Sequence, residues 1–383
     1  MDVKVLFINH VSQISGAENS LLSILAPLGE MGVEPLVAAP AGDPLTEVLK
    51  KRDIPRILIR GGRLTRRHFP FAQMSWGVRA IGDAAFVARE GKSRSVQVYH
   101  ANSTGAAMAV CLHPWVKPLV WHLRDLTPLG RCGKVLYGRV AAVVAISDAV
   151  ARTLADTVGS RDKIHVIPNG IDPCWLKGDP EGRLRVRKEW QIEEEAFLVG
   201  SVGQLVPWKR HEDLVEAVAI LTEKRDFNVK GVIVGGDLFH DHPKYQKALR
   251  TLAWARTDGR VRCVGYREDM RSVMSALDVL VCPSQAEPFG RVCLEAMASE
   301  RPVVATRAGG VVEVVEDGVT GILVEPGSPE KIADALERLA KDAELRGTMG
   351  REGQARVEEH FLSQETAGKL KALYDSLLSE AAR

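Results

Sequence analysis

Short runs of apolar, largely β-branched residues alternate with longer segments of helical periodicity along the chain. In the first half the runs VKVLFIN, VQVYHAN and VAAVVAIS each precede a stretch with apolar residues at helical spacing. In the second half the same rhythm restarts with FLVGSVG and continues through VKGVIVG, VLVCPS and PVVAT. Continuous apolar strands separated by helices are typical of parallel sheets built from βαβ units. The pattern therefore predicts an α/β protein with two doubly wound, Rossmann-like domains.

A segment rich in proline and glycine separates the two series of strands. Two prolines and two glycines interrupt any regular element there, and we place the hinge near residues 172–185. The predicted domains are residues 1–176 and 177–360, and residues 361–383 form a helical tail. A chain of 383 residues is about twice the usual domain size, which agrees with two domains.

The composition is that of an ordinary globular protein, with 45% apolar and 26% charged residues. The longest apolar run, Val140 to Ile146, is too short to cross a bilayer. The opening MDVKVLFINH enters an apolar strand without the basic lead and cleavage site of a signal peptide, so we expect a cytoplasmic protein. The six cysteines form no C-x-x-C pair, and we expect reduced thiols and neither disulfides nor zinc.

Basic residues are concentrated in one block of the first half. Residues 50–94 carry 12 basic and 3 acidic side chains, although the net charge of the whole chain is only +2. Three interpretations stay open: a solvated loop, contact with an anionic membrane surface at the inner face, or a site for a phosphate-bearing acceptor. The arginines at the centre of the block are Arg60, Arg63, Arg66 and Arg67.

Two glutamates, Glu287 and Glu295, flank the start of a helix predicted over residues 289–299. At a rise of 1.5 Å per residue they are about 12 Å apart, beyond the roughly 5–9.5 Å of paired glycosidase carboxylates. We therefore expect them to bind different groups of one long ligand, with Glu295 contacting a polar group such as a ribose diol. The backbone amides of Phe289 and Gly290 at the helix start predict a phosphate site.

Three other loops join a strand to a helix and carry polar candidates. Gly203 permits a tight backbone before Lys209, whose ammonium can neutralise a pyrophosphate. The loop around Gly16 lacks the G-x-G-x-x-G fingerprint and the Walker lysine, which argues against a dehydrogenase or an NTPase. His122 directly follows the run KPLVW, at the carboxyl end of a predicted strand, where parallel sheets bind their ligands. A purely structural histidine is the alternative.

Taken together, the chain resembles the retaining family 4 glycosyltransferases. Their GT-B fold consists of two Rossmann-like domains that face each other across a cleft, and the resemblance extends over essentially the whole chain. The motifs that carry it are Ser15-Gly16-Ala17-Glu18, Ala145-Ile146-Ser147, Val166-Ile167-Pro168-Asn169-Gly170-Ile171-Asp172, Gly203 to Lys209, the pair Glu287 and Glu295, and Ala308-Gly309-Gly310-Val311-Val312-Glu313.

The resemblance implies a binding site for a nucleotide-sugar donor. Lys209 would hold the diphosphate, Glu295 the ribose, and the loop with Tyr266 and Arg267 would flank the base. Many relatives have an arginine where this chain has Gln204, which can donate and accept hydrogen bonds but carries no charge.

The resemblance also implies where the sugar is transferred. Glu287 and the amides of Phe289 and Gly290 would hold the transferred sugar and its phosphate, and His122 would lie beside the reacting sugar. Gly16 would sit under the phosphates from the opposite domain. In such enzymes the C-terminal helix usually crosses back to the first domain. Catalytic roles thus fall to His122, Glu287 and Lys209.

The implied activity is retaining transfer from a UDP- or GDP-sugar to an acceptor hydroxyl, in the synthesis of a polysaccharide, other glycan, glycolipid or glycosylated metabolite. No metal ion is expected, since the sequence has no evident acid cluster such as D-x-D to hold one. No other cofactor and no nucleic-acid partner are expected. Two alternatives stay open: a silent subunit that binds a sugar nucleotide, and a nucleotide-sugar epimerase of the same fold. A phosphorylase is disfavoured, because no pyridoxal-phosphate lysine is evident.

Overall fold

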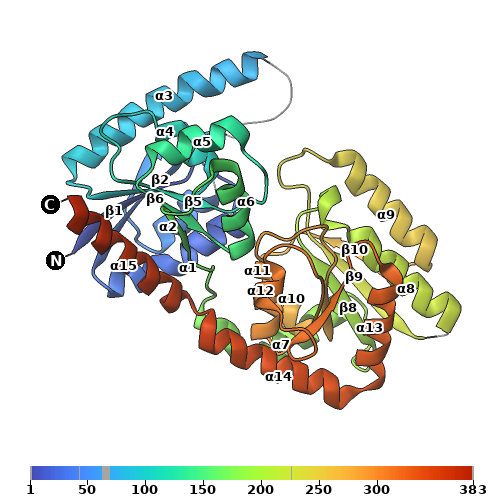
Figure 1. Ribbon diagram of the computed structural model, residues 1–383. Helices are drawn as coiled ribbons and strands as arrows, with labels where there is room; N and C mark the ends of the chain where they lie inside the picture. Colours follow the sequence, from blue (N-terminus) through green and yellow to red (C-terminus); the bar gives the residue numbers. More distant parts are fainter. Residues whose placement is uncertain (1, 43, 63–69, 226, 382–383) are drawn as a thin grey trace. The chain divides into compact units, whose positions relative to one another are not determined.

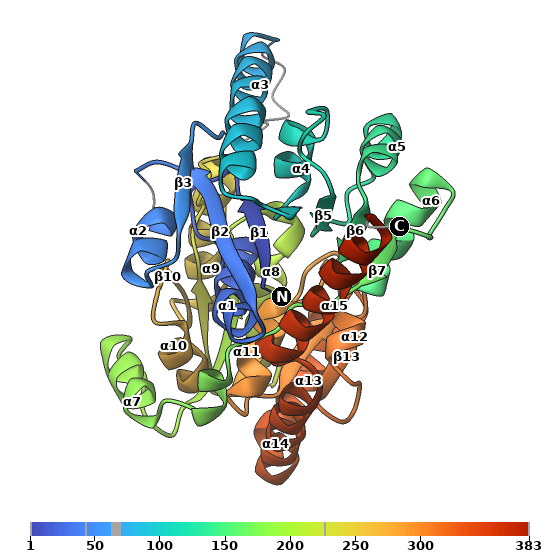
Figure 2. The same cartoon turned by 90° about the vertical axis from the view of Figure 1, so that its left-hand side faces the viewer.

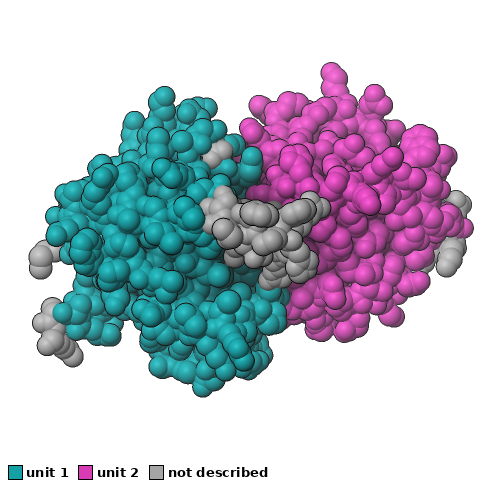
Figure 3. All heavy atoms as spheres, turned by 90° about the horizontal axis from the view of Figure 1, so that it is seen from above, with its two compact units in different colours: residues 1–170, 363–383 teal, residues 171–362 magenta. Residues whose placement is uncertain are grey.

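The computed structural model describes most of the chain, and its helices and strands are drawn in Figure 1. The described residues are 2–42, 44–62, 70–225 and 227–381. The chain divides into two compact units, coloured separately in Figure 3. Unit 1 comprises residues 1–170 and 363–383, and unit 2 comprises residues 171–362.

Unit 1 contains a parallel sheet of seven strands in the order β3-β2-β1-β4-β5-β6-β7. The strands β4, β5 and β6 are buried along their whole length, as expected for strands covered on both faces. The order reverses direction between β1 and β4, and ligands of such sheets bind beyond the carboxyl ends of the strands at that point. The strands are β1 (Val3–Ile8), β2 (Val33–Pro40), β3 (Arg56–Ile59), β4 (Val98–Ala101), β5 (Leu119–Leu123), β6 (Ala142–Ala145) and β7 (Ile164–Val166).

Seven helices in the described part of unit 1 accompany this sheet. They are α1 (Gly16–Glu30), α2 (Pro44–Lys51), α3 (Pro70–Ser93), α4 (Thr104–Val110), α5 (Gly130–Arg139), α6 (Asp148–Val158) and α15 (Ser363–Ala381). The last helix lies alongside α1, as Figure 2 also shows. Its residues Leu370 and Tyr374 join Phe7, Leu25 and Val120 in one apolar core, so the end of the chain completes the first unit.

Unit 2 contains a second parallel sheet, with six strands in the order β10-β9-β8-β11-β12-β13. The order reverses between β8 and β11, which are therefore neighbours although two other strands separate them along the chain. The strands are β8 (Phe197–Val202), β9 (Val229–Val234), β10 (Val261–Gly265), β11 (Val279–Cys282), β12 (Val303–Thr306) and β13 (Gly321–Val324). The helices are α7 (Pro180–Glu189), α8 (His211–Arg225), α9 (Pro243–Thr257), α10 (Met270–Ala276), α11 (Arg291–Ala298), α12 (Val311–Val314), α13 (Pro329–Lys341) and α14 (Ala343–His360), with short 3-10 turns η1 (Pro173–Lys177) and η2 (Pro207–Lys209).

The units divide a few residues away from the boundaries expected from the sequence, 176 and 360. The N–H of Ile171 donates to the carbonyl of Phe361 at 2.8 Å, and Gln354 Nε2 donates to the carbonyl of Leu176 at 3.1 Å. These bonds attach the predicted hinge to α14, so residues 171–177 belong to unit 2.

Part of the basic block is helical, so the loop interpretation is wrong for residues 70–93, which form α3. Apolar residues at helical spacing, among them Ala80, Ala84 and Val87, are buried on one side of this helix. Its Asp83 accepts hydrogen bonds from the backbone N–H groups of residues 60 and 61 at 3.0 and 2.8 Å. Arg63, Arg66 and Arg67 lie outside the described residues. Among the residues that are described, no helix is long and apolar enough to span a bilayer.

Candidate functional site

The centre of unit 2 is an ion pair between Lys209 and Glu287, whose Nζ and Oε2 atoms are 2.6 Å apart. Lys209 follows β8 and Glu287 follows β11, so the reversal of strand order brings together residues 78 positions apart. Both side chains are nearly buried, and Ser284 Oγ donates to the same carboxylate oxygen at 2.9 Å. Burial is the largest single influence and opposes the ammonium, but the charge and hydrogen bond of Glu287, together with Cys282 and Cys293, outweigh it and raise the pKa of Lys209. Lys209 is therefore a buried cation at the carboxyl edge of this sheet.

The loop of Glu287 is held in place by the segment that follows β12. The N–H of Glu287 donates to the carbonyl of Ala308 at 3.1 Å, and the N–H of Gly310 donates to the carbonyl of Glu287 at 2.7 Å. Between them Gly309 has φ +80°, and a Cβ atom there would lie 2.2 Å from the Glu287 carbonyl oxygen. Only glycine satisfies both conditions. The Ala-Gly-Gly motif thus positions Glu287.

The helix after Glu287 begins two residues later than the sequence predicted. The first helical residue of α11 is Arg291, because Gly290 has φ +99° and the ring of Phe289 is buried 6.2 Å from that of Phe361. Within the described part of the chain, the N–H groups of Phe289 and Gly290 donate to no protein acceptor. Two backbone amides without a protein acceptor, and the positive end of the helix dipole, thus directly follow Glu287 of the Lys209–Glu287 pair in the chain.

Glu295 lies more than one turn into α11 and is 9% exposed. Burial raises the pKa of its carboxyl, and this effect exceeds the opposing influence of Arg291, whose Nε donates to Oε1 at 3.0 Å. Glu295 is thus paired with Arg291, whereas Glu287 is paired with Lys209.

The loop between β8 and α8 is braced by His211, which the sequence analysis missed. Its ring bridges two elements: Nε2 donates to the Gln204 carbonyl at 3.0 Å, and Nδ1 accepts from Ser201 Oγ at 2.8 Å. Burial lowers the pKa of His211 to about 4, which keeps the ring neutral. At the start of this loop Gly203 has φ +155° and its N–H donates to the Val234 carbonyl at 3.0 Å. His211 contacts only the backbone of Gln204, and no hydrogen bond joins the Gln204 side chain to another residue in the described part of the chain, which leaves this side chain available to a ligand.

Charged groups near this loop are mostly engaged with each other. Arg210 forms two hydrogen bonds of 2.8 Å to Asp213, so it does not replace the arginine that many relatives have at the position of Gln204. Arg267, expected beside the base, is bound in the same way by Asp269.

Aromatic side chains offer flat surfaces next to the loop. Trp208 is 41% exposed, with Lys209 Nζ 4.5 Å from its ring centroid. Tyr266 is 50% exposed, and its Cβ lies close to Gly236, whose carbonyl accepts from the N–H of Leu205 at 3.1 Å. Tyr266 therefore lies beside the Gly203–Lys209 loop, whereas Arg267 is fixed by carboxylates.

In unit 1, His122 belongs to a buried polar network at the carboxyl edge of the sheet. Its Nδ1 lies 3.0 Å from His100 Nε2 and 3.3 Å from Arg124 Nη2. Arg124 is bracketed by Asn102 and Asn169, whose side-chain oxygens each accept from it at 2.8 Å. The sequence analysis missed these partners, although Asn102 ends the run VQVYHAN and Asn169 lies in the Pro-Asn-Gly-Ile-Asp motif.

Gly16 begins α1 directly after the loop that follows β1. Glu18 caps the start of this helix, since its Oε2 accepts hydrogen bonds from the Ser15 N–H at 3.0 Å and from Ser15 Oγ at 2.6 Å. A Cβ atom at Gly16 would meet nothing within 4 Å, so packing does not demand glycine here. The open space leaves room for a ligand to approach the backbone.

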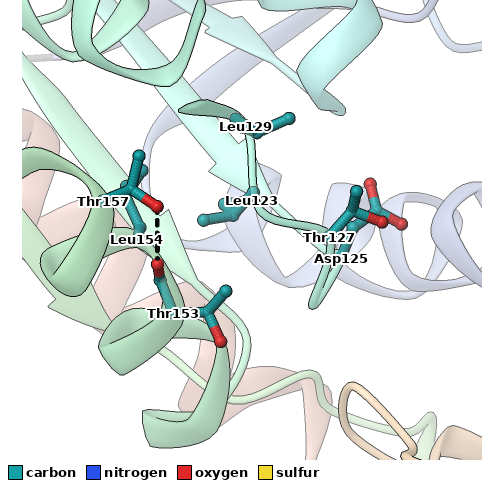
Figure 4. A pocket seen from close by; sticks show the side chains of 7 residues that line it. All are labelled: Leu123, Asp125, Thr127, Leu129, Thr153, Leu154 and Thr157. Carbon is teal, nitrogen blue, oxygen red and sulfur yellow. Dashed lines mark hydrogen bonds between the residues drawn. The ribbon is translucent and has the colours of Figure 1, made fainter. Parts of the chain in front are cut away.

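A small hollow lies beyond the end of β5, shown in Figure 4. The carboxylate of Asp125 and the hydroxyl of Thr127 lie side by side on one edge, and Thr153 and Thr157 of α6 lie on the other (Figure 4). The remaining lining residues are Leu123, Leu129 and Leu154. Thr153 and Thr157 donate to the carbonyls of Ala149 and Thr153 at 3.0 Å, and the hollow has no room for a water molecule, so we assign it no ligand.

The described residues contain no group of three or more His, Cys, Asp or Glu side chains that could hold a metal ion. Lys209 contributes a positive charge to the site, and the backbone amides add partial positive charges. The cysteines in the described part are free thiols.

Comparison with protein families identifies both halves of the chain. Residues 14–174 match the model "Glycosyltransferase Family 4", and residues 183–356 match "Glycosyl transferases group 1". The capsular polysaccharide biosynthesis glycosyltransferase CapM of Staphylococcus aureus is 29% identical over 244 residues, 62% of each chain. The D-inositol 3-phosphate glycosyltransferase of Corynebacterium glutamicum is 33% identical over 224 residues, 57% of this chain. The aligned segments span only 62% and 53% of these two relatives.

Solved structures resemble the chain over nearly its whole length. HepE of Anabaena, crystallised in complex with UDP-glucose, is 27% identical, with a TM-score of 0.83 over 97% of this chain and 99% of that one. Sucrose-phosphate synthase of Thermosynechococcus elongatus has a TM-score of 0.81 over 99% of this chain at 20% identity, which shows the fold alone. The prediction of two Rossmann-like α/β domains of GT-B type is confirmed.

Proposed function

This chain belongs to the family 4 glycosyltransferases, and from that premise we propose that it transfers a sugar from a UDP-sugar to an acceptor hydroxyl. The observation that carries the proposal is the buried Lys209 ammonium, which stands with the open amides of Phe289 and Gly290 at the carboxyl edge of the second sheet. Such a site suits a diphosphate. Among UDP-, GDP- and ADP-sugars, UDP-sugars are favoured because HepE, 27% identical, was crystallised with UDP-glucose.

The transfer would proceed with retention and without a metal ion. The bond between the anomeric carbon and the phosphate oxygen breaks while the acceptor oxygen bonds to that carbon on the same face. The acceptor proton passes to the departing diphosphate. Lys209 and the two amides stabilise the negative charge that develops on this leaving group. No protein nucleophile is invoked.

The wider role we propose is the synthesis of a polysaccharide or another glycan in the cytoplasm. It is supported by relatives such as CapM, described as a capsular polysaccharide biosynthesis glycosyltransferase. The acceptor would be a hydroxyl of a sugar, a lipid-linked sugar or another small polyol.

The proposal is tested by incubating the protein with UDP-glucose and related donors and measuring release of UDP. Slow donor hydrolysis without acceptor is expected, and it should persist in excess EDTA. The product formed from an α-linked donor, recorded by NMR immediately after the reaction, should be the α-anomer. Binding of UDP-sugars without any turnover would favour the silent subunit, and inversion of configuration at a ring carbon other than the anomeric carbon would favour the epimerase. Complete loss of activity in EDTA, restored by Mn²⁺ or Mg²⁺, would contradict metal independence.

A further inference from the structure

Three buried side chains of unit 1 form a continuous line of hydrogen bonds. Tyr374 Oη of α15 lies 2.7 Å from His100 Nδ1 of β4, and His100 Nε2 lies 3.0 Å from His122 Nδ1 of β5. All three residues are at most 1% exposed. The line therefore connects the last helix of the chain to the strand end that carries His122.

The contacts of His122 Nδ1 with Arg124 and His100 together fix which nitrogen of His122 carries the proton. A guanidinium has only donors, and Arg124 Nη2 lies 3.3 Å from His122 Nδ1, so Nδ1 must be the acceptor. His100 Nε2 must then donate to the same atom, and His100 Nδ1 accepts from the hydroxyl of Tyr374. Burial, and then the charge of Arg124, lower the pKa of His100 to about 3 and the pKa of His122 well below its usual value. Both rings are thus neutral, and the proton of His122 is on Nε2.

This Nε2–H group has no acceptor in the described part of the chain, although it is buried. A buried donor without a partner is uncommon, because its desolvation is not compensated. His122 is the second-to-last residue of β5, at the edge where ligands of parallel sheets bind. An oxygen atom of a ligand would satisfy the donor.

We propose that Tyr374 and His100 act with Arg124 as positioning residues that hold His122 in its Nε2–H tautomer, the form that can donate a hydrogen bond to an oxygen of a bound sugar. The identity of that ligand rests on the proposed function. His122 does not act as a general base, because a base needs an accessible lone pair and the lone pair on Nδ1 already faces two donors.

The tautomer is tested without any activity measurement. Long-range ¹H–¹⁵N NMR spectra of protein labelled at histidine distinguish protonated from unprotonated ring nitrogens, and the signals missing in His122→Gln identify this ring. A protonated Nε2 and an unprotonated Nδ1 are expected between pH 6 and 8. A proton on Nδ1, or an imidazolium, would overturn the proposal whether or not the protein transfers sugar.

Matched substitutions test the donor itself. The side-chain nitrogen of glutamine can occupy the place of Nε2, whereas that of asparagine reaches only the place of Nδ1. His122→Gln should therefore keep kcat/KM within about ten-fold of the wild type, and His122→Asn should lower it about 10- to 100-fold further, as expected for a lost buried donor. Equal activities of the two variants would overturn the donor role.

The positioning residues are tested in the same way. His100→Gln retains a donor toward His122, whereas His100→Met leaves Arg124 as the donor to Nδ1, so only the second should give a minor population of the other His122 tautomer. Tyr374→Phe should add a second tautomer of His100 and lower kcat/KM a few-fold, unlike the control Tyr137→Phe, whose hydroxyl bonds Asp162 elsewhere in the unit. Unchanged spectra and kinetics in both His100→Met and Tyr374→Phe would overturn the positioning role.

Failure of the two proposals can be told apart. If the wild type releases no UDP from any donor, the proposed function fails and the spectra still decide the tautomer. If it releases UDP, the His122 Nε2–H resonance should shift on addition of UDP-glucose. A resonance that does not move in an active enzyme would overturn the contact with substrate.

Discussion

Replacing Lys209 with methionine should weaken binding of UDP and lower stability by different mechanisms. Methionine has nearly the same length but no charge, so the packing of the side chain is largely retained. The substitution leaves the Glu287 carboxylate buried, with Ser284 Oγ as its hydrogen-bond donor at 2.9 Å. It also removes the only side-chain cation that contacts Glu287 in the described part of the chain.

The structure allows both effects to be estimated. A charge-assisted contact to a diphosphate contributes about 1.5–3 kcal/mol, so the Kd for UDP should rise about 10- to 150-fold. Breaking a buried ion pair by removing one partner typically costs about 3–5 kcal/mol of unfolding free energy. The double variant Lys209→Met with Glu287→Gln leaves no buried charge, so it should recover most of the stability but not the affinity for UDP.

The assay combines calorimetric titration with UDP and urea denaturation of the same preparations. Lys331→Met is the matched control, because this lysine is 69% exposed at its side chain and should change neither quantity. Affinity for UDP within two-fold of the wild type in both the single and the double variant would refute the role of Lys209 as the diphosphate ligand.

Three further predictions concern other parts of the molecule. Burial raises the pKa of Glu295, so the ionisation of this carboxyl lowers the stability of the fold as the pH rises from the unfolded pKa toward the raised folded pKa. Glu295→Gln should therefore be at least as stable as the wild type at pH 7, yet bind UDP about ten-fold more weakly. An affinity for UDP equal to that of the wild type would contradict the ribose contact. Gly309→Ala should lower the unfolding free energy, measured in urea, by more than about 2 kcal/mol, because it combines left-handed backbone strain with a clash against the Glu287 carbonyl. The control Gly368→Ala should not, because there is open space around Gly368. Similar stability of the two variants would refute this interpretation of the loop. If the basic block contacts an anionic membrane, neutralising its arginines should reduce sedimentation with anionic liposomes at low salt and have little effect at high salt, and equal sedimentation of the two proteins would remove that interpretation. The variant combines Arg63→Ala, Arg66→Ala and Arg67→Ala.

Local sequence patterns identified the fold class and most of the candidate loops. Continuous apolar runs between helical segments predicted two parallel sheets, because such strands are covered on both faces. The order strand, polar loop, helix placed Lys209, Glu287 and His122 at carboxyl ends of strands, and each of them is there in the structure. The helix over residues 70–93 was not recognised.

Tertiary structure alone decided which of these residues meet. Lys209 contacts Glu287 because β8 and β11 are neighbours, and strand order depends on the packing of whole βαβ units, which local periodicity does not encode. In the same way, Arg267 is fixed by Asp269, and His211 braces the donor loop. The tautomer of His122 involves the largest separation in sequence. It depends on Arg124, on His100 and on Tyr374, which lies 274 positions from His100 in the chain. A sequence specifies each of these side chains, but the hydrogen bonds that fix their chemistry form only when distant strands and the last helix share one core.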